Sequence, residues 1–245
     1  ILSHTTGYKR IGWNSKIEAG WSRAKMLGEL SKSPRTEPGK VFDYHNLAYS
    51  QIEDFVQSST KIPFKASMQK YLFDPLKMTR TTVGFSEFSQ QENKAWPHEK
   101  TRHWFRSKKK YSQNYHNTVM SAGGINSDIR DMARFLQLQL GAFPEIATEK
   151  DLEPFWEPAT RAPDAKGWFR HIKYKNLQSS YGYGWRIADI DGERIVFHGG
   201  WVGGFINFMA FSPKRQIGIV ILNNTETSFG FKTALKFLGY LDYGR

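Results

Sequence analysis

The stretch IVFHGGWVGGFINFMAF, residues 195–211, decides how the rest of the chain is interpreted. It begins with Ile-Val-Phe, a β-branched and aromatic run typical of a strand. The run stops at His198-Gly199-Gly200-Trp201, where a titratable side chain stands beside two glycines. Glycine allows another backbone or a ligand to approach closely. Alone, this stretch fits a glycine-rich hairpin and a substrate-holding strand edge equally well.

The composition is that of a globular protein. The chain has 245 residues, 39% of them hydrophobic, and eight tryptophans, which argues against disorder. No apolar run approaches the roughly 20 residues needed to cross a bilayer, and no basic-then-apolar signal segment opens the chain. Because it begins at Ile1 without a methionine, we expect an internal piece of a longer protein.

Cysteine and charge limit the chemistry and the partners. With no cysteine, disulfides, thiolate metal sites and a cysteine nucleophile are excluded, although the compartment is not fixed. Lys and Arg number 35 against 23 Asp and Glu, a net charge of +12. Such an excess favours contact with anionic partners such as nucleic acid, phospholipid or an acidic wall polymer.

Helices are predicted in the first part of the chain from apolar residues spaced three and four apart. A short one is expected near residues 22–30, and longer ones follow Asn46, Pro63 and Ser127, of which Asn46 and Ser127 are good N-caps. The predicted apolar faces are Ala48, Ile52, Phe55 and Val56, then Phe64, Met68, Tyr71 and Leu72, then Ile129, Met132, Ala133, Leu136 and Leu140.

Strands are predicted from residue 181 onward. Residues 183–190 and 194–198 are joined by Asp191-Gly192, a hairpin signal, and residues 206–211 and 216–223 by a four-residue turn. A last helix is expected to bury Phe231, Ala234, Leu235 and Leu238. Residues 85–117 and 143–180 show no sustained period. The pattern indicates helices and loops first, then an antiparallel meander capped by a helix.

Several blocks in this order resemble the serine β-lactamase-like superfamily, in particular class C β-lactamases, D-Ala-D-Ala peptidases and β-lactamase-fold esterases. The blocks are ILSHTTG from residue 1, PGKVFDYHN from 38, FDPLKM from 73, SAGGINSDIRDMARF from 121, YGYGW from 181, HGGWVGGF from 198 and FSPKRQIGIVILNN from 211. The resemblance implies an α+β fold, with an antiparallel sheet flanked by helices, a mainly helical region and the N-terminal portion missing. We expect one catalytic domain in two regions, residues 1–180 and 181–245.

The resemblance also implies site residues. In that family an SxxK serine and lysine perform acyl transfer, and a YxN motif and a K/H-x-G strand complete the site. Tyr44 would be the general base and acid, if nearby cations lower its pKa, and Asn46 would hold a substrate carbonyl. His198, Gly199 and Gly200 would form the substrate-binding strand, and the Trp201 backbone N–H would serve the oxyanion hole. Without the family order, Tyr44 would be a packed aromatic and Asn46 simply a cap.

His198 stands where the β-lactamases have a lysine, and histidine occurs there among the peptidase-like and esterase-like members. Imidazole titrates near neutral pH, whereas lysine keeps its charge. We therefore expect a weakened anchor for a substrate carboxylate and an activity that depends on pH.

The SxxK element is expected upstream of the ILSHTTG block, so this chain is predicted to lack its nucleophile segment. Three SxxK strings do occur, at Ser58–Lys61, Ser67–Lys70 and Ser107–Lys110. A working lysine must be buried to lose its proton near pH 7. None of the three offers that burial, so we interpret them as coincidences.

Other motifs are weaker. Ser3-His4 belongs to a block with a structural role in the family. His98 and His103 have no third ligand, so no metal is predicted. Ser121–Gly124 lacks the Lys-Ser/Thr of a phosphate loop and is expected to let the backbone pack closely. The basic aromatic loop Lys100–Tyr111 has the ingredients of a nucleic-acid contact, but a lid or wall-facing surface in contact with anions is the favoured interpretation.

The sequence thus predicts a β-lactamase-like serine hydrolase that cleaves an amide or ester through an acyl-serine, without metal or cofactor. The substrate would be a small molecule or peptidoglycan-like, and the family implies a periplasmic or otherwise extracytoplasmic location. The alternative enzyme is a D-aminopeptidase, carboxypeptidase or esterase of the same fold. The alternative from another class is a non-catalytic binding protein that retains the cleft.

Overall fold

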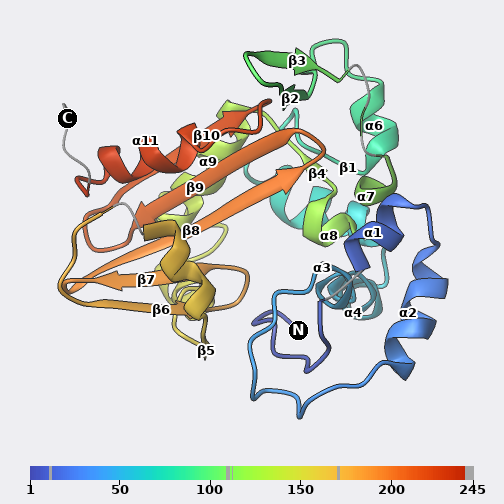
Figure 1. The fold of residues 1–245 in the computed structure, drawn as a ribbon, viewed down its shortest axis with the longest axis horizontal. Helices are drawn as coiled ribbons and strands as arrows, with labels where there is room; N and C mark the ends of the chain where they lie inside the picture. The colour runs from blue at the N-terminus through green and yellow to red at the C-terminus, as the bar shows by residue number, and fades with distance from the viewer. Residues whose placement is uncertain (11–12, 109–110, 112, 170–171, 241–245) are drawn as a thin grey trace. The chain divides into compact units, whose positions relative to one another are not determined.

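A computed structural model describes residues 1–10, 13–108, 111, 113–169 and 172–240 (Figure 1). The chain forms two compact units. Unit 1 comprises Ile1–Ala95 and Tyr111–Asp128, and unit 2 comprises Trp96–Lys110 and Ile129–Arg245. The two catalytic regions expected from the sequence, divided at residue 180, stay a prediction.

Unit 1 is mainly helical. A two-stranded antiparallel pair, β1 (Thr82–Val83) with β4 (Ile125–Asn126), is its described sheet structure. Its helices are α1 (Trp13–Glu18), α2 (Arg23–Lys32), α3 (Asn46–Tyr49), α4 (Ile52–Thr60), α5 (Phe64–Met68) with the π-helix η1 (Gln69–Phe73), α6 (Phe85–Ser89), α7 (Gln113–Thr118) and α8 (Met120–Gly123).

The helix predicted after Asn46 is two helices, α3 and α4, and Asn46 is not its N-cap. His45 is the cap, because its side-chain Nδ1 accepts the Ala48 N–H at 3.2 Å. The helix is interrupted between Tyr49 and Ile52, so the predicted apolar face does not continue. Ala48 is buried but Phe55 is exposed. The buried side chain of α4 is Glu53.

The other predicted helices of unit 1 formed, with one shift of register. The helix near residues 22–30 is α2, capped by Ser22. The helix after Pro63 is α5, which widens into η1. A π-turn adds a residue to the helical repeat and rotates the residues after it around the helix axis. Phe64, before the π-turn, is buried as predicted, whereas beyond it Phe73 is buried and the predicted face residue Tyr71 is exposed.

Unit 2 contains a six-stranded antiparallel sheet in the order β10-β9-β8-β7-β6-β5, so each strand pairs with its neighbour in sequence. The strands are β5 (Thr160–Arg161), β6 (Leu177–Tyr181), β7 (Arg186–Ile190), β8 (Glu193–Val202), β9 (Phe205–Ser212) and β10 (Ile217–Asn223). The unit also contains the hairpin β2 (His98–Lys100) and β3 (Phe105–Ser107), and the helices α9 (Ile129–Gln139), α10 (Glu149–Leu152), η2 (Glu153–Phe155), η3 (Pro163–Phe169) and α11 (Phe229–Phe237).

The predicted meander is confirmed, and its tight turns have the expected chemistry. Ile190 pairs with Glu193 across Asp191-Gly192, whose φ angles are 50° and 90°. Positive φ at both central residues is the requirement of a type I′ hairpin. The strands β5 and β6 were missed within the stretch interpreted as irregular, and so was the β2–β3 hairpin. These strands are two to five residues long and exist through pairing rather than through an apolar pattern of their own.

Helices cover both faces of the sheet (Figure 1). On one face, α11 and η3 cover a core that includes Phe169, Phe197, Phe208 and Leu235, and the predicted burial of Ala234, Leu235 and Leu238 is confirmed. On the other, α9 lies on β10, where a Cβ on Gly218 would be 2.9 Å from Leu136. The predicted stripe of α9 is wrong at its start, because Ile129 is exposed and Asp131 is buried.

Candidate functional site

The YxN motif of unit 1 is held by a histidine from the first block of the chain. The His4 Nδ1 accepts the His45 backbone N–H at 3.0 Å, and both imidazoles are buried. The His4 ring centroid lies 4.1 Å from that of Tyr44 and 4.9 Å from that of Tyr49. An Nδ1 that accepts must leave the ring proton on Nε2, so His4 is neutral when this bond is made. His4 therefore fixes the backbone beside Tyr44 and one face of its ring.

Asn46 has a partner that the sequence did not indicate. Its Nδ2 donates to the hydroxyl of Tyr115, a buried residue on α7. Burial, and then the negative charge of a Tyr44 phenolate, raise the pKa of Tyr115. The same causes raise the pKa of Tyr49 to about 12. The phenols of Tyr49 and Tyr115 are thus harder to deprotonate than an ordinary tyrosine. The only signal for Tyr115 was an aromatic residue in a stretch without a period.

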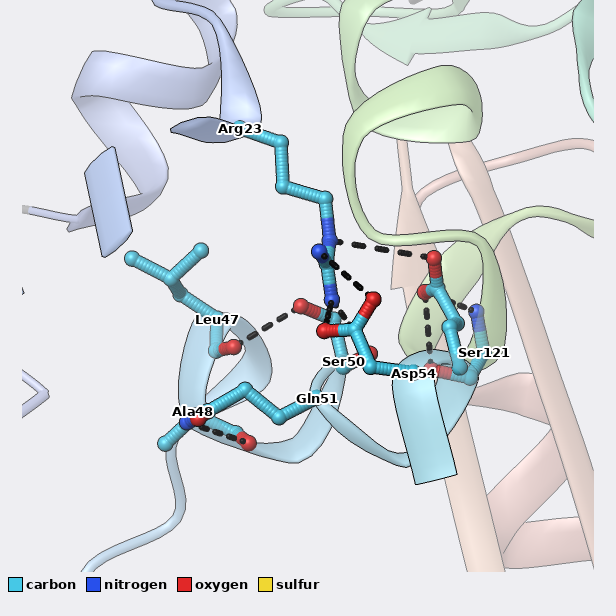
Figure 2. Close-up of polar contacts among 8 residues, drawn as sticks. Arg23, Leu47, Ala48, Ser50, Gln51, Asp54 and Ser121 are labelled. Atoms are coloured by element: carbon cyan, nitrogen blue, oxygen red, sulfur yellow. Dashed lines mark hydrogen bonds and ion pairs between the residues drawn. The ribbon is translucent and has the colours of Figure 1, made fainter. Parts of the chain in front are cut away.

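The buried carboxylate of Glu53 connects α4 to α8 within unit 1, and Figure 2 shows its partners Arg23 and Ser121. The Glu53 Oε1 accepts from both the backbone N–H and the hydroxyl of Ser121, each at 2.9 Å. The Arg23 Nε lies 3.8 Å from its other oxygen, and Arg23 also binds Asp54 and the Ser50 carbonyl. Burial is the largest effect on the carboxyl and raises its pKa, against the Ser121 and Arg23 contacts. The network fixes the start of the Ser121–Gly124 block.

Gly124, at the end of that block, serves close packing, as the sequence indicated for the block as a whole. A Cβ there would lie 2.5 Å from the His116 carbonyl oxygen and 2.7 Å from the Met120 Cα. Any side chain would push these backbone segments apart.

In unit 2, the HGGW segment lies beyond the end of the β7–β8 strand ladder. The β7–β8 ladder runs from Ile190↔Glu193 to Arg186↔Phe197 and ends there. The ladder of β8 with β9 continues to Val202↔Phe205. Among the described strands, residues 199–202 therefore have strand pairing with β9 alone. Their other edge carries backbone N–H and C=O groups to which an extended substrate can bind by strand addition.

His198 is a neutral imidazole at neutral pH, which corrects the expectation that it titrates near pH 7. Its Nε2 lies 3.2 Å from the hydroxyl of the buried Tyr181 on β6. Burial, and then the positive charge of Arg186, lower its pKa to about 4, against a hydrogen bond with the Gly199 backbone. Its side chain therefore acts as a hydrogen-bonding group and not as a cation.

The remaining predicted site residues of unit 2 differ in their surroundings. A Cβ on Gly199 would be 2.6 Å from the Trp168 ring, so the absence of a side chain at Gly199 allows the Trp168 indole to pack against the strand. Gly200 is exposed, and a Cβ there would meet nothing within 4 Å. The Trp201 side chain is 69% exposed. Gly200 and Trp201 are thus the accessible part of the edge.

The SxxK strings do not form an acyl-transfer pair in the described residues. Ser58 and Lys61 are both exposed. Ser67 is buried, with its hydroxyl 2.9 Å from that of Thr60, but Lys70 is exposed. Lys110 of the third string lies outside the described residues. Within the described part of the chain, no three His, Asp or Glu side chains group as a metal site.

The chain belongs to the Beta-lactamase family, whose model matches residues 1–239. It is 26% identical over 216 residues to the protein flp of Staphylococcus aureus, strain MRSA252, in a match that covers 85% of this chain and 37% of flp. The chain thus spans well under half of that relative. The proteins of the family that resemble this chain are mostly hydrolases.

Solved structures share the fold. The octameric penicillin-binding protein homologue from Pyrococcus abyssi superposes with a TM-score of 0.80 at 19% identity, over 97% of this chain and 55% of that one. The D-amino acid amidase from Ochrobactrum anthropi SV3, in complex with D-phenylalanine, gives 0.67 at 17% identity over 97% and 74%. The predicted α+β, β-lactamase-like fold and superfamily are therefore confirmed. None of the described helices is both long and apolar enough to span a bilayer.

Proposed function

We propose that the whole protein is a serine hydrolase that cleaves an amide or ester through an acyl-serine. The observation that carries the proposal is the edge of β8 at residues 199–202, beyond the end of the β7–β8 ladder. The chain belongs to the Beta-lactamase family and also holds a Tyr-x-Asn motif at the start of α3. The substrate would lie extended along residues 198–202, and the Trp201 N–H would bind the oxyanion.

The chemistry assigned to unit 1 is proton transfer. Tyr44 takes the proton of the attacking serine hydroxyl as the Oγ–carbonyl bond forms, and delivers it to the leaving amine or alkoxide as the scissile bond breaks. Water then hydrolyses the acyl-serine. Because none of the SxxK strings fits, the serine would lie outside residues 1–245 of the whole protein. Asn46, oriented by Tyr115, binds a substrate carbonyl.

A D-amino amide, D-peptide or ester is the favoured substrate class over a β-lactam. The observation behind this choice is the neutral His198, which offers no fixed positive charge to a substrate carboxylate. The family also favours an extracytoplasmic location, which cell fractionation would test.

The test is covalent labelling of the folded, full-length protein. A fluorophosphonate probe should form a stable adduct that mass spectrometry places on one serine, and a fluorescent penicillin should label more slowly. Stoichiometric binding of substrate analogues without any adduct from either probe would favour the non-catalytic binding protein instead.

A further inference from the structure

One feature of unit 2 has no part in the proposed chemistry. Residues Trp96–Lys108, with strands β2 and β3 of Figure 1, form a projection that we name the aromatic-basic hairpin. Strand pairing runs from His98↔Ser107 to Lys100↔Phe105. Its four cations, against the single acid Glu99, are Lys100, Arg102, Arg106 and Lys108.

The tip of the hairpin is fixed so that it presents an aromatic side chain. The Thr101 backbone N–H donates to the Trp104 carbonyl at 2.8 Å. The Thr101 hydroxyl donates to the same carbonyl at 2.7 Å and lies 3.1 Å from the Trp104 N–H. Held in this turn, the Trp104 side chain is 70% exposed, and Phe105 beside it is 45% exposed. An indole that a closed turn holds exposed to solvent is suited to contact with a partner surface.

The base of the hairpin is attached to the end of the six-stranded sheet. The His98 N–H donates to the Asn224 carbonyl at 2.8 Å, and the Asn224 Nδ2 donates to the Trp96 carbonyl at 3.0 Å. Pro97 packs so closely on Gly204 that a Cβ there would be 2.9 Å away. The Lys108 Nζ lies 3.7 Å from Glu226. The base of the hairpin is therefore fixed to the sheet, and the tip extends from it.

The charges nearest the tip favour an anionic partner. The Arg106 Nε donates to Glu99 at 3.2 Å, so these two charges offset each other. Lys100 and Arg102 flank the turn, and both are exposed. Tryptophan and phenylalanine settle at the boundary between headgroups and acyl chains, and nearby Lys or Arg adds attraction to anionic lipid.

We propose that the aromatic-basic hairpin is a peripheral anchor that inserts Trp104 and Phe105 into the interface of an anionic phospholipid bilayer. Single-stranded nucleic acid is the less fitting partner, because it needs successive stacking platforms along a groove. Here the two aromatic side chains lie at the projecting end of a two-stranded turn. The proposal does not depend on the catalytic role of the β8 edge.

The test is co-sedimentation of the full-length protein with vesicles of phosphatidylcholine and phosphatidylglycerol in equal parts, compared with phosphatidylcholine alone. We expect binding to the anionic vesicles and much weaker binding to the neutral ones. Trp104→Ala should weaken binding by about tenfold. The double variant Lys100→Gln with Arg102→Gln should weaken it by roughly twentyfold or more, since each charge contributes about fivefold at an anionic surface.

A matched control lies in unit 1, where Lys70 and Tyr71 form another exposed pair of cation and aromatic ring, 5.0 Å apart. Lys70→Gln with Tyr71→Ala should leave vesicle binding unchanged. Equal binding by the hairpin variants and this control would overturn the proposal. So would the absence of binding to anionic vesicles by a folded protein, including the case in which it binds a single-stranded DNA oligonucleotide instead.

Discussion

Removing the Glu53 carboxylate should destabilise the protein far more than removing the neighbouring Asp54. The Glu53 side chain is only 6% exposed, and its Oε1 is the acceptor for two hydrogen bonds from Ser121. Asp54 is exposed, although it pairs with Arg23 at 2.9 Å. The two carboxylates share one arginine but differ in burial, which makes them a matched pair.

The loss of unfolding free energy expected for Glu53→Ala follows from the contacts of its carboxylate. Hydrogen bonds to a charged group contribute about 1.5–3 kcal/mol each, and a buried donor left unsatisfied costs about 1–3 kcal/mol. Burial of the carboxylate offsets part of this, as its raised pKa indicates. We therefore expect Glu53→Ala to lower the free energy of unfolding by about 3 kcal/mol. Asp54→Ala should cost at most about 1 kcal/mol, since exposed ion pairs contribute little.

Glu53→Gln separates charge from hydrogen bonding. The amide oxygen still accepts from Ser121 and carries no charge to desolvate, so we expect a change within about 1 kcal/mol of wild type. Urea unfolding, followed by circular dichroism, measures all three variants. If Glu53→Ala costs no more than Asp54→Ala, or if the glutamine variant is as unstable as the alanine variant, the assigned network is wrong.

The raised pKa of Glu53 predicts how the stability of the protein depends on pH. The folded-state pKa of Glu53 lies above its ordinary value of 4.5. The folded state therefore binds this proton more tightly than the unfolded state does. The contribution of Glu53 to stability is largest below pH 4.5 and declines as pH rises through the raised pKa. In Glu53→Gln this decline should be absent, so the difference between the two stability curves isolates the group.

Three further predictions concern the candidate site. His4→Ala should slow acylation by roughly tenfold, because Tyr44 loses the imidazole that contacts its ring and the His45 N–H loses its acceptor. His4→Asn, which can still accept, should restore part of the rate at unchanged KM. Because the pKa of His198 falls to about 4 on folding, stability should drop as pH decreases from 6.5 towards 4, by about 1–3 kcal/mol, and denaturant titrations at several pH values should show no such drop in His198→Gln. Gly199→Ala should lower the free energy of unfolding by about 1–3 kcal/mol through its clash with Trp168, whereas Gly200→Ala, with open space around it, should be neutral, as urea midpoints would reveal.

The sequence predicted those features that are encoded locally. The Asp191-Gly192 turn, the strands on either side of it and the buried face of α11 follow from backbone preferences and apolar spacing within a few residues. The order of the motif blocks correctly predicted the superfamily to which the chain belongs. Predicting these elements required no information about contacts between distant residues.

The features that the sequence missed depend on contacts between distant residues. Tyr115 acts on Asn46 across 69 positions of the chain, and Glu53 binds Ser121 across 68. The pKa of His198 is lowered by burial and then by the charge of Arg186, and its ring contacts Tyr181; only the folded sheet brings these residues together. Similarly, the π-turn η1 rotated Tyr71 to the surface against an apolar pattern that was correct locally. Hydrophobic spacing carries no information on such partners.

The most direct test of the proposed function is the rate at which the full-length protein is acylated by a fluorophosphonate or a D-amino ester, compared with Tyr44→Phe. The variant keeps the ring that contacts His4 and loses only the hydroxyl, so its melting temperature should stay within a few degrees of wild type. Loss of a general base should slow acylation by about 10²–10⁴-fold. An acylation rate equal to that of wild type, in a variant that remains folded, would contradict the role given to Tyr44 and the mechanism built on it.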